Sequence, residues 1–164
     1  MTDATGIQRI LVFIEGNEAS LLAAQYAIWL ARLTGAELTA IYVVDVKTLE
    51  ELLRARIFVR MEELDYERDI EDDGRRYLNH VRDLAEAKRV SVTTVLEKGE
   101  VHSLVAQKAK EIGADLLVMG ERHAPLSRRD CYFDEGERIL CEARCPVLMV
   151  KGDEKIREMY EGLE

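Results

Sequence analysis

The chain has 164 residues, of which 48% are hydrophobic and 34% are charged, and its formal net charge is −9 at pH 7. This length suits a single domain, which we expect to span residues 1–164 with a core at 8–151 and a charged C-terminal tail at 152–164. The acidic balance excludes nucleic acid and an anionic membrane as main partners, because phosphate groups bind to positive protein surfaces.

Nothing in the sequence predicts a membrane segment. No apolar run reaches the roughly 18 residues that a membrane-spanning helix requires, and residues 1–6 lack the basic-then-apolar pattern of a secretion signal. The cytoplasm is therefore the expected location. The chain has three cysteines, Cys131, Cys141 and Cys145. An odd number without a secretion signal is typical of free thiols in a reducing compartment.

The first third of the chain alternates between strand and helix patterns. Residues 10–14 form a compact apolar run, which predicts a buried strand. Residues 20–33 have the apolar spacing of a helix, and Gly35 stands where a helix C-cap glycine belongs. Residues 38–44 are rich in β-branched and aromatic side chains, which predicts a second strand. A strand, a helix and a strand in so short a stretch predict a right-handed βαβ unit.

The highly charged region at 47–88 is predicted to be helical. Three leucines near its start, at positions 49, 52 and 53, indicate a short helix. A stripe of apolar residues at helical spacing then predicts a long amphipathic helix at 61–88, with Gly74 inside it allowing close packing. We interpret the many charges as the solvated face of this helix.

The remainder of the chain repeats the alternation. We expect strands at 90–96, 115–119 and 147–150, helices at 101–112 and 135–143, and one or two helical turns in the tail. Asp134 is a plausible N-cap of the helix at 135–143. Runs that are apolar at every residue are typical of strands buried on both faces. Five strands with helices between them predict an α/β fold with a doubly wound parallel sheet.

Several segments resemble the universal stress protein family. These are ILVFIEGNE at 10–18, IYVVD at 41–45, GADLLVMG at 113–120, ERIL at 137–140 and ARCPVL at 143–148. The resemblance covers the chain from Ile10 to Val150. It implies a five-stranded parallel sheet with strand order 3-2-1-4-5, of the adenine-nucleotide α-hydrolase-like type, and homodimers that pair through the last strand.

The last strand supports a homodimer on its own pattern. Val147, Leu148, Met149 and Val150 are all apolar, yet the implied strand order puts them at the edge of the sheet. An exposed apolar edge invites pairing with another chain, so a second copy is the natural cover. The sequence names no other protein partner.

Some members of the family bind ATP through a glycine-rich pattern of Gly, two residues, Gly, nine residues, Gly, then Ser or Thr. The ERIL segment fixes the register here, so that Gly120 fills the first glycine position. His123, Phe133 and Asp134 stand at the other three positions. Phe133 brings bulk where backbone should meet phosphate, and Asp134 places a carboxylate at a helix start where phosphate would sit. The ATP pocket is therefore predicted to be degenerate.

The candidate remnant pocket lies where the strands end. Glu15 stands where the family has Asp, and Asp45 ends the second strand at the edge where this fold class binds ligands. The candidate residues are Glu15, Gly16, Val44, Asp45, Gly120, Arg122, His123, Arg128 and Asp134.

Two alternatives use the basic loop around Arg122, His123 and Arg128. In the first, arginines replace the glycine backbone as phosphate ligands, which would give an ATP- or AMP-binding switch or a weak ATPase. In the second, the loop and Cys131 form a small-anion or thiol-redox sensor. The simpler interpretation, which we favour, is that these charged side chains form the solvated face of a loop and bind no ligand.

No catalytic or metal-binding residues are predicted. The chain has no Cys-x-x-Cys and no paired histidines, and His80, His102 and His123 are scattered. We therefore favour a non-enzymatic, cytoplasmic, homodimeric regulatory or stress-response protein without a cofactor.

Overall fold

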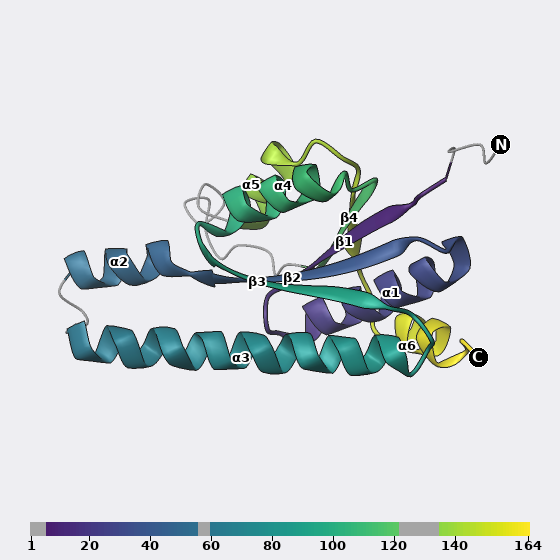
Figure 1. The fold of residues 1–164 in the computed structure, drawn as a ribbon, viewed down its shortest axis with the longest axis horizontal. Coiled ribbons are helices and arrows are strands. Elements are labelled where there is room, and N and C mark those ends of the chain that lie inside the picture. Colours follow the sequence, from purple (N-terminus) through teal and green to yellow (C-terminus); the bar gives the residue numbers. More distant parts are fainter. Residues whose placement is uncertain (1–5, 56–59, 122–134) are drawn as a thin grey trace.

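The computed structural model describes residues 6–55, 60–121 and 135–164. Its centre is a five-stranded sheet in the order β3-β2-β1-β4-β5, in which all neighbouring strands are parallel (Figure 1). The strands are β1 (Arg9–Ile14), β2 (Glu37–Asp45), β3 (Val92–Gly99), β4 (Leu116–Gly120) and β5 (Val147–Val150). The predicted fold class and strand order are confirmed.

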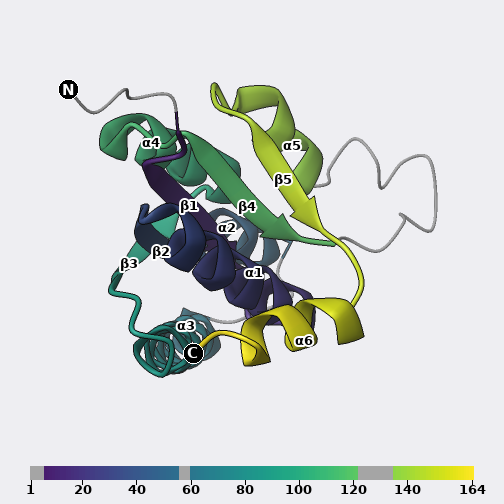
Figure 2. The same ribbon diagram turned by 90° about the vertical axis from the view of Figure 1, so that its right-hand side faces the viewer.

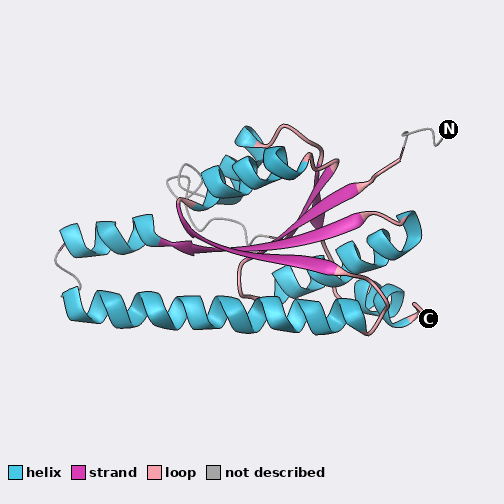
Figure 3. Ribbon diagram, viewed as in Figure 1, coloured by secondary structure: helices cyan, strands magenta, loops and turns pink. Residues whose placement is uncertain are grey.

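Helices cover both faces of this sheet, as Figure 3 shows. They are α1 (Glu18–Thr34), α2 (Val46–Arg54), α3 (Arg60–Glu86), α4 (Val101–Ile112), α5 (Glu135–Glu142) and α6 (Glu154–Glu161). Helices α1, α3 and α6 lie on one face, and α4 and α5 lie on the other (Figure 2). Within the described residues, no helix is long and apolar enough to span a membrane.

The alternation of side chains along β1 explains the two halves of the core. Ile10, Val12 and Ile14 pack with α1, α3 and α6, whereas Leu11 and Phe13 pack with α4 and α5. Successive side chains of a strand point to opposite faces, so a strand covered on both faces must be apolar throughout. This is why the run at 10–14 could be identified as a central strand.

The third strand differs from its prediction at 90–96, because it begins at Val92. The backbone N–H of Val90 donates to the carbonyl of Ala85 at 2.9 Å, and so closes the C-terminal turn of α3. Arg89, after the end of α3, has a left-handed φ of 57°. The residues in this conformation after α1 and α4 are glycines, Gly35 and Gly113. The turn that ends α3 thus includes Val90, which the apolar pattern had assigned to the third strand.

Helix α3 confirms the long helix predicted at 61–88. Together with α2 it extends beyond the end of the sheet (Figure 1). Its apolar stripe packs on the α1 face of the core through Leu78, Val81 and Ala85. Tyr66, at the outer end of the predicted stripe, is 45% exposed, because there α3 has passed the sheet.

The C-terminal segment, expected as a charged tail, contains α6. Ile156 and Tyr160 are buried there and join the core. Helix α6 lies beside α1 (Figure 2). The Tyr160 hydroxyl donates to the carbonyl of Leu84 on α3 at 2.7 Å. The Lys88 ammonium donates to the carbonyls of Glu161 and Leu163. These contacts fasten α6 to α3.

Candidate functional site

The candidate residues that the structure describes lie at the carboxyl edge of the sheet. Parallel strands in register end together, and β1 pairs with β2 through Ile14 and Tyr42 and with β4 through Val12 and Val118. This brings Glu15, Gly16, Val44, Asp45 and Gly120 to one edge. The remaining candidates and their neighbours lie outside the described residues, so their roles stay predictions: Arg122, His123, Arg128, Cys131, Phe133 and Asp134.

Gly120 has a packing role that needs no ligand. A Cβ at this position would lie 2.5 Å from the backbone carbon and oxygen of Ala19, and 2.9 Å from the nitrogen of Ser20. The end of β4 therefore touches the first turn of α1, and only glycine permits this approach. A glycine at position 120 is thus no sign by itself of a phosphate site.

The turn after β1 is also fixed by packing. Gly16 has a φ of 76°, and a Cβ there would lie 3.1 Å from the ring of Tyr77 on α3 and 3.3 Å from the ring of Tyr42. Glu15 is half-buried, and the side chain of Val44 is fully buried in the core. Val44 could therefore offer only its backbone to a ligand.

The carboxylate of Asp45 is engaged in capping α2. Its Oδ1 accepts the backbone N–H of Thr48 at 3.0 Å, and its Oδ2 accepts the Thr48 hydroxyl at 2.6 Å. Such caps satisfy the free N–H groups of a first helical turn. Asp45 thus lies at the predicted edge, but both of its carboxylate oxygens already accept hydrogen bonds from Thr48.

Sequence analysis missed a buried histidine beside this edge. His102, only 7% exposed, lies at the start of α4 and meets α5. Its backbone N–H and its ring Nδ1 lie 3.1 Å and 2.8 Å from Oε2 of Glu135. Its Nε2 lies 3.3 Å from a carboxylate oxygen of Glu142 and 3.5 Å from one of Glu100. We call His102, Glu100, Glu135 and Glu142 the histidine cluster.

Glu100 links this cluster to α2. It forms an ion pair with Lys47 and accepts the Ser103 hydroxyl at 2.7 Å. The hydrogen bond from Lys47, and next that from Ser103, lowers the pKa of Glu100 to about 2. These groups border a cavity of about 310 Å³ whose lining residues are Asp45, Lys47, Thr48, Glu51, Glu100, Val101, Glu135 and Arg138. Four of these eight side chains are carboxylates, so the cavity is acidic.

The start of α5 is acidic as well. Glu135 and Glu137 both lie in its first turn. The Nη1 atom of Arg138 lies 3.4 Å from the second carboxylate oxygen of Glu135. Carboxylates in a first turn interact favourably with the positive end of the helix dipole. The start of α5, which could attract a phosphate, is therefore already occupied by carboxylates of the chain itself.

The described cysteines show no redox or metal arrangement. Cys141 is exposed and Cys145 is half-buried, and both are free thiols. Burial raises the pKa of the Cys145 thiol, which makes the reactive thiolate scarcer. In the parts of the chain that the structure describes, no group of three His, Cys, Asp or Glu side chains could hold a metal ion.

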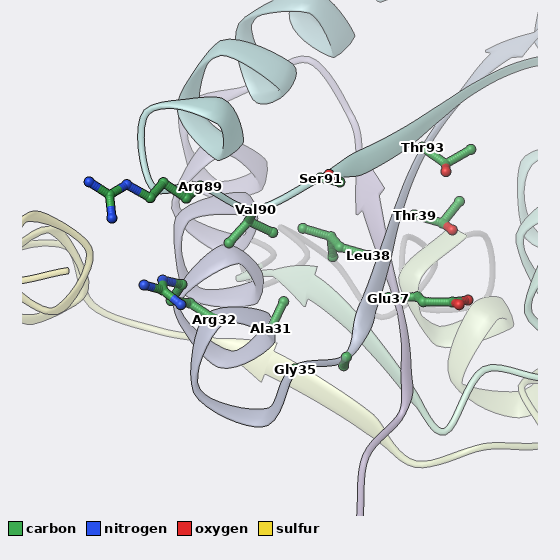
Figure 4. A pocket seen from close by; sticks show the side chains of 11 residues that line it. Ala31, Arg32, Gly35, Glu37, Leu38, Thr39, Arg89, Val90, Ser91 and Thr93 are labelled. Atoms are coloured by element: carbon green, nitrogen blue, oxygen red, sulfur yellow. The ribbon is translucent and has the colours of Figure 1, made fainter. Parts of the chain in front are cut away.

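A second cavity, of about 370 Å³, opens at the opposite, amino edge of the sheet (Figure 4). Arg32 of α1 and Arg89 of the turn after α3 lie on one side of it. Glu37 and Thr39 of β2 lie on the other, with Thr93 of β3 above them. The arginine heads point away from Glu37 and Thr39 and out of the cavity (Figure 4). The groups around this cavity therefore do not converge on a common ligand position.

Comparison with known proteins identifies the family to which this fold is similar. A model of the universal stress protein family matches residues 6–151. Universal stress protein MJ0531 of Methanocaldococcus jannaschii is 32% identical over 148 residues, which cover 90% of this chain and 84% of that protein. A structure from the same family in Burkholderia pseudomallei superposes with a TM-score of 0.65 at 27% identity, over 89% of this chain and 97% of that one.

A third match carries a nucleotide. The universal stress protein from Archaeoglobus fulgidus, solved in complex with dAMP, has a TM-score of 0.59 at 13% identity. The match covers 89% of this chain and 98% of that one. At so low an identity, the likeness demonstrates a shared fold and leaves the ligands of the two proteins to be compared residue by residue.

Proposed function

Because this chain belongs to the universal stress protein family, we propose that it is a regulatory stress-response protein acting through protein contacts. In this proposal it works in the cytoplasm as a homodimer and catalyses no reaction. Its remnant nucleotide pocket does not accept ATP. The observation that carries the proposal is the carboxylate of Glu135, held at the start of α5 by His102.

The described residues do not fit a polyphosphate. A helix start binds phosphate through free N–H groups and the positive end of its dipole. Here the first turn of α5 carries Glu135 and Glu137, and the adjacent cavity adds Glu51 and Glu100. Two like charges about 4 Å apart repel by roughly 4 kcal/mol at an effective dielectric constant of about 20. Lys47 and Arg138 pair with Glu100 and Glu135, so two carboxylates remain in excess among these groups. Two such contacts would outweigh the contribution of the helix dipole, which is about 1 kcal/mol.

Calorimetric titration of nucleotide-stripped protein with ATP tests this proposal. We expect no binding heat for the natural protein at millimolar ATP. The variant Glu135→Gln/Glu137→Gln removes both carboxylates of the first turn while keeping their size, and binding gained by it would identify these charges as the barrier. Micromolar ATP binding by the natural protein would refute the proposal and make hydrolysis the next assay.

The second candidate function is binding of an adenosine monophosphate. It is favoured by the shared fold of the Archaeoglobus fulgidus protein that was solved with dAMP. A monophosphate carries less charge than ATP, so the acidic edge repels it less. In this alternative Arg122 and Arg128 supply the phosphate contacts. Titration with AMP and dAMP separates the two functions, because only the second expects binding that Arg122→Gln weakens.

The proposed dimer rests on the edge of β5. The carbonyl of Pro146 accepts the backbone N–H of Leu117 at 2.9 Å, so Pro146 directs its backbone toward β4. In a parallel ladder alternate residues face the same neighbour. Val147 and Met149 therefore direct their N–H and C=O groups away from β4. An apolar edge with free backbone groups is a template for a second strand.

The variant Met149→Pro tests this interface. Proline removes one outward N–H group without removing a bond to β4. We expect the natural protein to be dimeric by sedimentation and light scattering, and Met149→Pro to be monomeric. The matched variant Met149→Thr keeps the N–H group and should stay dimeric. A monomeric natural protein, or a dimeric proline variant, would exclude pairing through β5.

A further inference from the structure

We propose that His102 is a proton-dependent latch that fastens α5 to α4, which gives this protein a second function as a pH sensor. The inference goes beyond the proposed regulatory role, because the latch works whether or not a nucleotide binds. It rests on the contacts of one buried ring and on the charges around it.

The latch depends first on the number of proton donors that the ring carries. Both ring nitrogens of His102 face carboxylate oxygens: Nδ1 lies 2.8 Å from Glu135, and Nε2 lies 3.3 Å from Glu142. Carboxylates only accept hydrogen bonds, whereas a neutral imidazole has one donor nitrogen and one acceptor nitrogen. Only the imidazolium form can donate to both glutamates. A neutral ring leaves a lone pair facing a carboxylate, and that contact is repulsive.

The balance of charge in the histidine cluster also depends on the proton of the ring. The ring meets the carboxylates of Glu100, Glu135 and Glu142. Two of these have a cation of their own, because Lys47 of α2 pairs with Glu100 and Arg138 of α5 pairs with Glu135. On its own helix, the ring's neighbour Ser103 is uncharged. Among the residues that the structure describes, an imidazolium therefore neutralises the third carboxylate, and loss of its proton leaves the cluster with one excess negative charge.

The positions of the glutamates allow one ring to hold the whole of α5. Glu135 and Glu142 are the first and last residues of α5. They are seven residues apart, which is close to two helical turns, so both side chains point from the same face of α5. One histidine thus contacts both ends of the helix. Helix α5 has only two buried residues, Gly136 and Ile139, so a polar latch carries much of its attachment.

These observations predict a transition when the ring loses its proton. Below the transition the imidazolium bridges Glu135 and Glu142 and holds α5 against α4. Above it the carboxylates repel one another, and α5 loosens. Lys47 keeps the pKa of Glu100 near 2, so this carboxylate stays charged throughout. The transition therefore depends on the ring.

Hydrogen exchange measured between pH 6 and 8.5, and corrected for its intrinsic pH dependence, tests the latch. We expect the protection of α5 amides to fall by roughly tenfold across this range, relative to α3 amides. The variant His102→Gln has no titrating ring and should lose this pH dependence. The control His80→Gln replaces an exposed histidine on α3 and should keep it. Equal pH dependence in both variants would overturn the proposal.

NMR of the imidazole nitrogens provides a second measurement that needs no variant. Both nitrogens of His102 should carry protons at pH 6, and one should lose its proton as α5 loosens. The variant Glu142→Gln removes one charge from an exposed side chain, which should move the midpoint of the transition to lower pH. A His102 ring that is neutral at pH 6 would refute the latch, even if His102→Gln fails to fold.

Discussion

Gly74 on α3 faces the ring of Tyr42 on β2 so closely that a methyl group at position 74 would lie 2.6 Å from Cδ1 of that ring. Leu96 of β3 lies on the same side, with Cδ1 3.0 Å from the same point. Tyr42 is only 8% exposed and belongs to the core. The absence of a side chain at Gly74 therefore lets the long helix lie directly on β2 and β3.

The variant Gly74→Ala should be destabilised although alanine favours helices. The helical preference contributes about 1 kcal/mol in favour of alanine. Displacing the buried Tyr42 ring costs about 1–3 kcal/mol, so the net loss of unfolding free energy should reach up to about 2 kcal/mol. Urea unfolding measures this. The exposed Asn79→Ala on the same helix should be neutral or slightly stabilising, and a stabilised Gly74→Ala would show that α3 can move away from the sheet.

The close packing at Gly74 and the five strands could be predicted because each has a local signal. A glycine inside an apolar helical stripe indicates a close approach, and a run such as 10–14 indicates a strand covered on both faces. The start of β3 could not be placed, because Arg89 ends α3 in a conformation that usually requires glycine. The burial of Ile156 and Tyr160 could not be predicted either. It depends on the packing of α6 against α1 and α3, and the sequence of α6 shows mainly charged residues.

The candidate site was predictable only in part. The edge with Gly16, Asp45 and Gly120 follows from the direction of parallel strands. The cap that Asp45 gives to α2 involves Thr48, a residue three positions away. The contact between His102 and Glu135 joins residues 33 positions apart, and it exists only because α4 and α5 pack on the same face. No local pattern contains that information.

Asp115 predicts a change of stability with pH. Its carboxylate accepts the backbone N–H groups of Gln8 and Arg9 at 2.8 Å and 2.9 Å, and so joins the start of β4 to the start of β1. These two bonds, first that from Gln8, lower the pKa of Asp115 below its ordinary value of 3.8. A lowered pKa means that the stabilisation is present above the unfolded value and is lost as the pH falls through the folded one.

The variant Asp115→Asn should therefore melt several degrees below the natural protein at pH 7. The difference should shrink below pH 4, because the natural protein then loses the same charge. Thermal unfolding of both proteins at pH 7 and pH 3 measures this. Asp69→Asn, at an exposed position on α3, is the control and should match the natural protein at both values. A gap that is equal at pH 7 and pH 3 would mean that the stabilisation by Asp115 does not depend on the charge of its carboxylate.

Helix α6 should contribute to the stability of the whole domain. Ile156 is 6% exposed within the core, so Ile156→Ala should cost about 2–5 kcal/mol of unfolding free energy. Tyr160→Phe keeps the ring but removes the hydrogen bond to the carbonyl of Leu84, which should cost about 0.5–1.5 kcal/mol. The exposed neighbour Lys155→Ala should have little effect. Denaturant unfolding with all three variants would reveal a loosely attached α6 if Ile156→Ala were as stable as Lys155→Ala.

Lys47 is predicted to control the charge of Glu100. The pKa of Glu100 is about 2, and the hydrogen bond from Lys47 is the largest cause, ahead of that from Ser103. Lys47→Met keeps the length of the side chain but removes its charge, so the pKa of Glu100 should rise toward the ordinary 4.5. Ser103→Ala should raise this pKa by a smaller amount. Carbon NMR of the glutamate carboxyl groups during an acid titration resolves both shifts.

The relative size of these two pKa shifts shows whether α2 or α4 controls the charge of Glu100. A larger rise in Lys47→Met places the control on α2, so that a movement of α2 would reach the start of α4 through Glu100. A larger rise in Ser103→Ala would place it within α4 and leave α2 uncoupled from the histidine cluster. Because the Glu100 pKa is lowered, its contribution to stability is complete above pH 4.5 and is lost as the pH falls toward 2. Lys47→Met should therefore flatten the acid limb of the stability curve, and an unchanged limb would contradict the assignment.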